Sequence, residues 1–464
     1  MEREVNNDMF NITEPILVDN SIEAKEFKSF NPQSYAEINI PGHTIEINIP
    51  AGDAYYRPSN SFINIKGRLI RANDQAYARD AQVGLINNAL MYLFENIEYS
   101  LGGKIVERLN YPGHTTSILG YLSYPDDFNT STGLKQLWCK DTNVDAVSTK
   151  YVQSPLVPAV AQGVAVPAIA AGHFTTHHEP TYNQGFAVRR SVLLDNDSPG
   201  SFSFNIPFSH IFGFAEYDKI LYNLSHNLKF TRASDVFAIH KAANAHDGKI
   251  LLTDIRWIIP KIKPSIKDRQ SLLELVLNKS VLPVHFCARN DEHRILNQTT
   301  SFEWVLNRSA GVEKPRWIIV GFQTDKNTTQ VQNPAVFDHI NLNGACVKLN
   351  GDRYPSDTVE IDFARNNYVR FYEMADEFKR EYYGINNLIG GTQINFASYK
   401  SLFPLFVFDV RHQSEQVRSN VMSIEINFTF SENVPANTHA YAVILSDRIF
   451  KLTSDGQTPM METY

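Results

Sequence analysis

The segment from Leu402 to Leu452 most strongly constrains how this chain can fold. It contains three apolar stretches separated by polar loops, and apolar and polar residues alternate strictly from Ile424 to Phe430 in the middle stretch. Successive side chains of a strand point to opposite faces of a sheet, so this alternation predicts a strand with one buried face. A Pro-Ala-Asn turn then leads into the third stretch. The pattern is typical of two β-sheets packed face to face.

Length and composition extend this prediction to the whole chain. The 464 residues exceed the size of one ordinary β-sandwich and suit two domains of roughly 200 residues. Aromatic residues make up 12% of the chain, with 29 Phe and 21 Tyr, and long stretches of helix-forming residues are missing. This composition favours an all-β protein with an aromatic core.

The first half of the chain predicts an N-terminal arm followed by one β-domain. Residues 1–30 show no sustained period and are expected to form an arm that takes part in assembly. Residues 31–263 are expected to form the first domain, with a loop insertion at about 130–183 and a linker at 260–264. Apolar spacing predicts a helix over 82–99. Strands are expected at 35–40, 45–49, 62–70, 186–194, 203–207, 227–232 and 250–259.

The second half predicts a comparable β-domain over residues 264–452. Helical spacing of Phe371, Met374, Phe378 and Tyr382 predicts a helix over 368–383. Residues 453–464 are expected to form a polar tail. Strands are expected at 272–278, 284–289, 301–307, 317–323, 340–349 and in the C-terminal segment described above.

The net charge and the lengths of the apolar runs argue against nucleic-acid binding and against a membrane-spanning segment. The net charge of −7 provides no global basic field, so direct, sequence-specific binding of nucleic acid is not expected. The longest apolar runs are interrupted by Gln, Gly and Pro and are too short to span a bilayer. The first residues carry no apolar core of a signal peptide, which predicts synthesis in the cytosol. The three cysteines are widely spaced and are expected to be buried free thiols.

Candidate chemical sites in the sequence are weak. His173, His177, His178 and Glu179 resemble a metal cluster, but Gly, Thr and Pro around them favour a solvated loop over a fixed ligand set. The acid pairs Asp126-Asp127 and Asp376-Glu377 are better explained by a turn and a solvated helix face than by calcium binding or acid–base catalysis. No common catalytic or nucleotide-binding motif occurs. We therefore predict no catalytic residue, no cofactor and no metal, and hence no enzyme.

Five segments spread along the chain carry a family resemblance. They are FNIPFSHIFGF (204–214), YNLSHNLKFTR (222–232), RWIIVGFQT (316–324), FPLFVFDVRHQSE (403–415) and PANTHAYAVILSDR (435–448). In these segments the chain resembles the double jelly-roll major capsid proteins of Polinton/Maverick elements and adintoviruses. The resemblance departs from the family in the insertion at 130–183.

The resemblance implies a structural role. It implies two tandem eight-stranded jelly rolls with short helices in the loops, and a pseudo-hexagonal homotrimer that tiles an icosahedral shell. The implied partners are further trimers, a penton protein, and minor or cementing capsid proteins. The implied location is the virion, after assembly in the host nucleus or cytoplasm.

A second class of function stays open at this point. A two-domain β-sandwich protein could bind carbohydrate or process glycosides, with exposed Trp platforms and two facing carboxylates. Only four Trp occur, and Trp257 and Trp317 lie in strongly apolar predicted strands. This favours the structural role.

Overall fold

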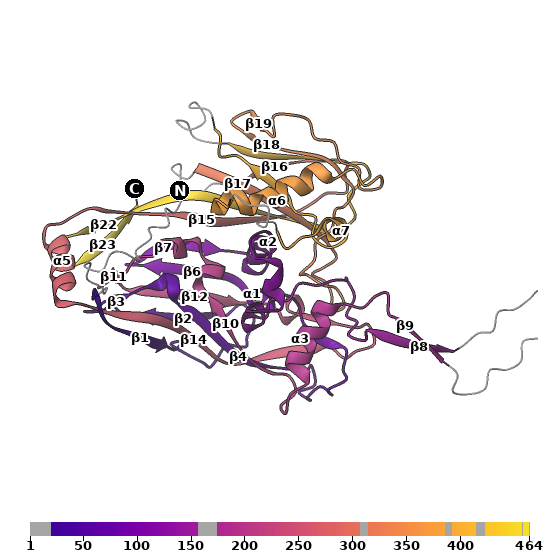
Figure 1. Cartoon of the computed structure of the whole chain (residues 1–464), viewed down its shortest axis with the longest axis horizontal. Coiled ribbons are helices and arrows are strands. Elements are labelled where there is room, and N and C mark those ends of the chain that lie inside the picture. The colour runs from indigo at the N-terminus through magenta and orange to yellow at the C-terminus, as the bar shows by residue number, and fades with distance from the viewer. Residues whose placement is uncertain are drawn as a thin grey trace, which may run out of the picture.

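The chain forms two β-sandwiches that lie side by side, as the computed structural model shows (Figure 1). The structure describes residues 20–155, 174–306, 314–385, 392–413, 423–456 and 458–463. Within each sandwich, the inward side chains of two antiparallel sheets form one apolar core.

The first sandwich is built from the N-terminal half of the chain. One sheet contains β10 (Ser201–Pro207), β4 (Phe62–Arg71), β14 (Gly248–Pro264), β3 (Tyr55–Tyr56) and β11 (Leu221–Tyr222), with β1 (Ile22–Phe30) paired to β14. The facing sheet contains β2 (Thr44–Ile49), β12 (His226–Arg232), β6 (Phe94–Leu101) and β7 (Lys104–Leu109).

The second sandwich is built from the C-terminal half. One sheet contains β15 (Leu282–Ile295), β22 (Thr438–Ser454), β17 (Lys314–Thr324) and β20 (Phe406–Asp409), with β23 (Pro459–Thr463) paired to β22. The facing sheet contains β16 (Ser301–Leu306), β21 (Ile424–Phe430), β18 (Leu342–Leu349) and β19 (Asp352–Tyr354).

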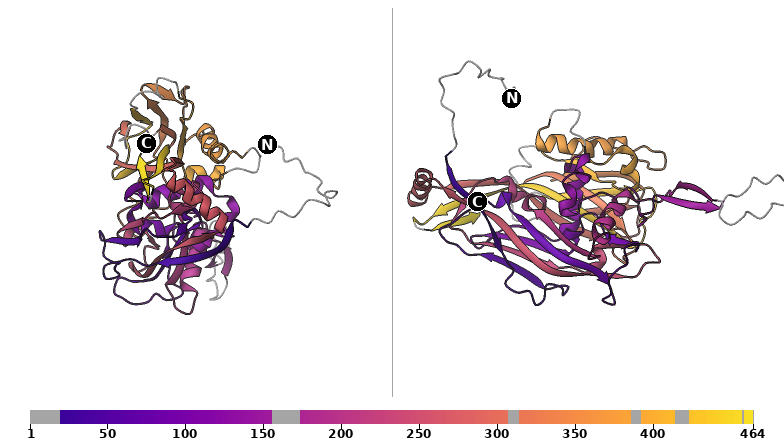
Figure 2. Two further views of the ribbon diagram at one scale, coloured as in Figure 1. Left: turned by 90° about the vertical axis from the view of Figure 1, so that its left-hand side faces the viewer. Right: turned by 60° about the horizontal axis from the view of Figure 1, so that its bottom comes forward.

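Helices and small strand pairs fill the connections. The α-helices are α1 (Ala89–Tyr92), α2 (Pro112–Ser123), α3 (Gln184–Leu194), α4 (Phe208–Ile211), α5 (Ile266–Leu277), α6 (Val369–Tyr383) and α7 (Phe396–Ser401). Short 3₁₀ turns are η2 (Pro58–Asn60), η3 (Asp126–Asn129), η4 (Gly133–Gln136), η5 (Gly213–Glu216) and η6 (Asp235–Phe237). Two separate strand pairs join β5 (Val83–Leu85) to β13 (Ile239–Lys241) and β8 (Tyr151–Pro155) to β9 (Phe174–His178). The β8–β9 pair projects from the end of the molecule opposite α5 (Figure 2).

Two long strands belong to both halves of the molecule. The strands β15 and β22 pair in continuous register from Leu282↔Leu452 to Ile295↔His439. At one end Val284, Phe286 and Phe450 pack in the core of the first sandwich, whereas Ile444 of β22 packs in the core of the second. A rigid ladder therefore crosses the junction between the sandwiches.

The strand predictions that rest on strict alternation are confirmed. In β21 the side chains of Ile424, Ile426, Phe428 and Phe430 are buried, and those between them are not. The predicted helix at 368–383 is confirmed as α6, which buries Phe371 and Phe378. The expectation of an all-β fold with two sandwiches is confirmed in the same way.

The helix predicted over 82–99 is wrong. This segment forms β5, the single turn α1 and the first part of β6, with Asn88 in the left-handed region (φ 60°) between β5 and α1. The apolar residues fit helical spacing by chance, but pairing with β12 buries Ile97, Tyr99 and Leu101 on one face of a strand. Long-range pairing therefore outweighs local periodicity here.

Two predicted strands are helices. Residues 186–194 lie in α3, where Phe186, Arg189 and Leu193 are buried at helical spacing and the Asn183 side chain accepts a hydrogen bond from the Phe186 N–H. Residues 272–278 lie mostly in α5, which begins after Ser265, whose hydroxyl accepts from the Asp268 N–H. Both helices carry an N-cap residue that the apolar pattern alone does not reveal.

The ends of the predicted domains also differ from the structure. Residues 35–40, expected as a strand, form turns, and the expected linker at 260–264 is the end of β14. Residues 22–30 of the expected arm pair with β14 as β1, and its residues 1–19 lie outside the described residues. The expected polar tail likewise forms β23, in which Met461 is buried. Backbone pairing at open sheet edges explains both terminal strands.

The expected loop insertion at 130–183 begins with packed residues. Leu137 and Trp138 are buried, and Asp141 forms a fully buried ion pair of 2.7 Å with Arg189 of α3. Within the described part of this segment, the β8–β9 pair extends away from the body (Figure 1). Among the described residues, no helix has the length and apolar character needed to cross a bilayer.

Replacing Phe406 with Asp should prevent soluble folding. The Phe406 side chain is fully buried in β20, with its ring 5.6 Å from that of Phe371 and 5.7 Å from that of Phe322. An unpaired carboxylate there carries a desolvation cost of several kcal/mol. Soluble yield and thermal melting measure the effect, with the exposed Glu432→Ala as a nearly silent control. Normal yield and melting of Phe406→Asp would contradict this assignment.

Candidate functional site

The most unusual element of the molecule is helix α2, which lies between the two sandwiches. Every residue from Pro112 to Leu122 is buried. The helix contacts α1 and β6 of the first sandwich and α6 and β22 of the second. A helix that is buried all round is expected to carry no charged side chain, and PGHTTSILGYLS carries none at neutral pH when His114 is neutral.

Two glycines allow α2 to pack this closely. A Cβ atom at Gly120 would lie 2.2 Å from the Trp138 ring, and one at Gly113 would lie 2.5 Å from the Tyr92 ring. Pro112 at the first turn fixes the start of the helix. The sequence predictions did not include α2, although Pro112 and Pro125 bound an uncharged segment of helical length.

The carboxylate of Asp291 caps α2 from the second sandwich. Its oxygens accept hydrogen bonds from the backbone N–H groups of Asn110 (2.8 Å) and Tyr111 (2.7 Å) and from the Thr115 hydroxyl (2.9 Å). Burial raises the pKa of Asp291, and these donors act against the increase. Because Asp291 belongs to β15, the start of α2 is fixed by the opposite half of the molecule.

A second buried carboxylate, Glu107 of β7, joins three elements. It accepts hydrogen bonds from the backbone N–H groups of Gly213 (3.1 Å), Phe214 (3.0 Å) and Arg289 (2.8 Å). The Arg289 guanidinium donates in turn to the carbonyl oxygens of His210 (2.7 Å) and Ser209 (3.0 Å). Burial raises the pKa of Glu107, whereas Arg289 and the three N–H groups lower it. This network connects β7 and η5 to β15.

A cluster of histidines lines a cavity of about 250 Å³ at the same junction. The ring of His114 in α2 stacks on Tyr441 at 3.7 Å, and its Nε2 lies 3.1 Å from the Gln323 Oε1. His293 Nε2 lies 2.6 Å from His439 Nδ1, and one of these two rings must accept the hydrogen bond. At least one ring of this pair must therefore be neutral.

Burial keeps these histidines neutral at physiological pH. It lowers the pKa of His114 to about 3 and that of His293 to about 4, where the neighbouring His439 adds to the effect. Burial also lowers the pKa of His439, although Asp325 acts against this. The cluster stabilises the junction as uncharged rings.

The histidines singled out in the sequence lie elsewhere. His177 and His178 are exposed neighbours in β9, so their side chains point to opposite faces of the strand. Glu179 accepts a hydrogen bond from the Thr181 hydroxyl (2.8 Å), and His173 lies outside the described residues. The strand geometry does not bring His177 and His178 together. Among the described residues, no group of three or more His, Cys, Asp or Glu is arranged to hold a metal ion.

The two acid pairs have structural partners. Asp126 accepts a hydrogen bond from the Lys140 Nζ at 2.7 Å, and Asp127 lies beside it in η3. Asp376 forms an ion pair of 3.1 Å with Arg380, one turn further along α6, and Glu377 is its neighbour on that helix. The two pairs approach each other around Lys379 of α6: burial lowers the pKa of this lysine, and the nearby Asp127 and Asp376 both act against that change.

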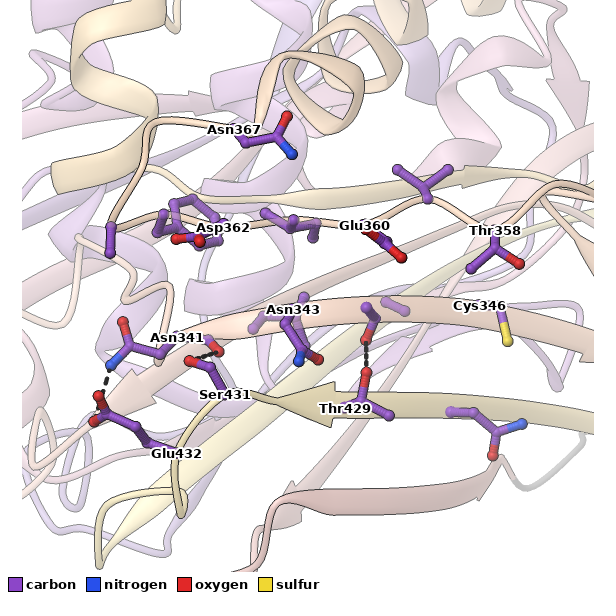
Figure 3. Close-up of a pocket in the computed structure, with 18 of the residues that line it drawn as sticks. Asn341, Asn343, Cys346, Thr358, Glu360, Asp362, Asn367, Thr429, Ser431 and Glu432 are labelled. Carbon is purple, nitrogen blue, oxygen red and sulfur yellow. Dashed lines mark hydrogen bonds between the residues drawn. The ribbon is translucent and has the colours of Figure 1, made fainter.

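A polar groove of about 1000 Å³ lies over the sheet of the second sandwich (Figure 3). The strands β18 and β21 form its floor, and the segment 358–367 forms its other wall. Its acidic side chains are Glu360, Asp362 and Glu432. Its basic side chains are Lys348, Arg353 and Arg365, so the charges of the lining are balanced. The Asn341 amide donates to Glu432 over 3.4 Å. The sequence predictions did not include this groove, because β21 in its floor lies far along the chain from β18 and the segment 358–367.

The cysteine thiols and the tryptophan indole rings are buried. All three cysteines are free and buried, as predicted, and burial raises the pKa of Cys287 to about 12. The four tryptophans of the sequence are buried as well. Their indole rings therefore offer no platform for stacking a sugar, and a thiol with a raised pKa makes a poor nucleophile.

Comparison with known proteins assigns the fold. The sequence model of the double jelly roll-like domain matches residues 177–450, which is more than half of the chain. The chain belongs to the double jelly roll-like domain family. The expected double jelly-roll fold is thereby confirmed, with its two sandwiches as the two rolls.

Two solved structures resemble this double jelly roll along nearly its whole length. The structure of the Sputnik virophage superposes with a TM-score of 0.54 at 11% identity, covering 100% of this chain and 92% of the matched chain. The Faustovirus major capsid protein superposes with a TM-score of 0.51 at 8% identity, covering 97% of this chain and 94% of that protein. No curated protein sequence matches the chain. At these identities the likeness concerns the fold alone.

Replacing Glu107 with Gln should weaken the junction. The amide group would present N–H donors where the carboxylate now accepts from three backbone N–H groups, leaving at least one buried donor without an acceptor. We expect a loss of about 1–3 kcal/mol in the free energy of unfolding. Chemical denaturation measures it, with the exposed Glu95→Gln as the control. Equal stability of both variants and the wild type would contradict the role of this network.

Acidification should destabilise the protein through the histidine cluster. The folded pKa of His293, about 4, lies below the usual value of 6.5, so the unfolded chain binds more protons at low pH. The contribution of neutral His293 to the free energy of unfolding is fully present above pH 6.5. It is lost as the pH falls towards 4, and the loss reaches roughly 1–2 kcal/mol at pH 5. Glu107 and Asp291 have raised pKa values, so their protonation on acidification acts against this loss of stability.

The comparison of variants isolates the histidine contribution. The variant His293→Gln should lose less stability between pH 7 and pH 5 than the wild type, in melting curves recorded at each pH. The exposed His285→Gln, on the same strand, should follow the wild type. Parallel pH profiles for all three proteins would refute a role for His293.

Proposed function

We propose that this protein is a major capsid protein and that its role is assembly. The observation that supports this most directly is the rigid connection of two jelly rolls through the buried helix α2. Membership in the double jelly roll-like family supports it further, as does the likeness in fold to the Faustovirus major capsid protein. A pair of sandwiches with mostly paired edges makes a stable tile.

The proposed assembly unit is a homotrimer. Two similar rolls per chain give six near-equivalent corners when three chains close a ring, and such a unit tiles a shell with hexagonal packing. Obligate interfaces of this kind bury large areas. The proposed partners are further trimers, a penton protein, and minor or cementing proteins. We propose the virion as its location and the Polinton/Maverick and adintovirus type as its group, on the basis of the sequence motifs given above.

We propose that the rolls divide near residue 264. The first roll would then comprise residues 31–263 and the second residues 264–452, with β1 and β23 added at their edges. The β8–β9 pair, at the end opposite α5, is proposed to rise towards the outer surface of the shell. The net charge of −7 fits a shell in which another component neutralises the genome.

The carbohydrate-binding or glycoside-processing alternative receives no support from the side chains. All four tryptophans are buried, and the acid pairs proposed from sequence have Lys140 and Arg380 as partners. We accordingly propose a structural function without catalysis. Binding of the purified protein to a panel of immobilised glycans would favour the alternative.

The purified protein should be a homotrimer. Light scattering should give three times the mass of one chain across micromolar concentrations, since obligate interfaces resist dilution. Negative-stain images should show particles with a hexagonal outline. A monomer at all concentrations tested, with no shells in the images, would contradict the proposed function.

A further inference from the structure

Helix α5 combines a high apolar content with the absence of any buried residue. It holds six Ile, Leu and Val residues among its twelve, yet none of its residues is buried. Ile266 is 77% exposed and Leu277 is 65% exposed. Leu275 in the helix, and Val281 just after it, are also exposed. An apolar surface of this kind on a soluble protein usually contacts another segment or partner.

A small apolar cavity continues this surface. It has a volume of about 90 Å³ and lies between α5, β11 and the β22–β23 pair, lined by Leu272, Val276, Tyr222, Leu452 and Pro459 among others. Cavities that hold small-molecule ligands usually measure 300–1,000 Å³. A cavity of this size instead suits one or two apolar side chains of a peptide segment.

The chain itself supplies such a segment at this place. The Ser265 N–H, directly before α5, donates to the carbonyl oxygen of Ser21 at 2.8 Å, and Ile22 pairs with Pro264. The first nineteen residues of the sequence therefore join the described fold beside the start of α5 (Figure 2). They include apolar residues at Met9, Phe10, Ile12, Ile16, Leu17 and Val18.

The reach of this segment matches the length of the helix. A helix of twelve residues is about 18 Å long, and an extended chain covers roughly 3.3 Å per residue. Residues 12–18 lie two to eight positions before Asn20 and so can reach any point along α5. Phe10 can reach the cavity at the far end of the helix.

Opposite charges on the N-terminal segment and around α5 favour contact between them. Residues 1–19 contain five acids and one base, whereas residues 260–280 contain five bases and two acids. Lys263 and Arg269 already pair with Glu23 and Asp53 near the start of α5. The acidic segment and the basic corner attract each other, which favours docking over release into solvent.

We propose that residues 9–18 of the chain's own N-terminal segment lie along α5 and place an apolar side chain in the adjoining cavity. This inference does not rest on the proposed capsid role. It assigns to the exposed face of α5 an occupant from the same chain.

Amide hydrogen exchange of the full chain tests the contact. Removal of residues 1–19 should speed exchange in α5 by about tenfold or more, because loss of a contact that buries a large apolar side chain makes local opening of the helix more frequent. The double variant Phe10→Asp and Ile12→Asp should match the deletion. The control Asn6→Asp and Asn7→Asp adds the same charge at polar positions and should match the wild type. Exchange in β4 should stay unchanged throughout. Equal exchange of α5 in the full chain and the deletion would overturn the proposal.

A pair of cysteines distinguishes the chain's own segment from that of a neighbour. In the variant Asn11→Cys and Asn278→Cys, the second position is exposed at the end of α5, while the native thiols are buried. Mild oxidation should give a disulfide within one chain, with the mass of one chain on a non-reducing gel. Addition of Phe10→Asp should reduce its yield. A bond mainly between two chains, or a yield unaffected by Phe10→Asp, would overturn the proposal.

Discussion

The junction of this double jelly roll depends on two buried carboxylates that accept backbone hydrogen bonds from across it. Glu107 receives an N–H from Arg289 of the second roll, and Asp291 of the second roll receives the N–H groups before α2. A buried carboxylate is costly unless donors surround it. Separating the rolls would take all of its donors from Asp291, and it would take the Arg289 N–H from Glu107, which would keep only Gly213 and Phe214. These hydrogen bonds therefore help to fix the relative position of the rolls.

The other elements of the junction fit this constraint. The uncharged helix α2 needs Gly113 and Gly120 to approach Tyr92 and Trp138, and its first turn depends on Asp291. The strands β15 and β22 continue from one core into the other, so a change in the angle between the rolls would break their common register. The neutral histidines make this junction sensitive to acid, because protonation of both His293 and His439 would leave no ring to accept their hydrogen bond.

Sequence predicted the parts of the fold in which burial follows a simple period. Strict alternation placed β21, and helical spacing with polar residues between placed α6. The failures have physical causes: β6 is fixed by pairing with β12, whereas α3 and α5 begin at the capping residues Asn183 and Ser265. The junction was missed altogether, because Glu107 and Asp291 are single acids whose partners lie far away in the chain. Only the three-dimensional structure brings such partners together.

The two ends of the molecule differ in a way that the proposed role explains. One end carries the projecting β8–β9 pair, whereas the other collects β1, α5 and β23 (Figure 1). At the α5 end, edge strands are paired only on one side, and apolar side chains such as Phe27 and Leu277 remain exposed. Exposed edges and apolar side chains are a liability for an isolated protein, and they persist where a further contact covers them. In the proposed capsid role, a neighbouring subunit would cover the free edges of β1 and β23, whereas the N-terminal segment of the same chain is proposed to cover the face of α5.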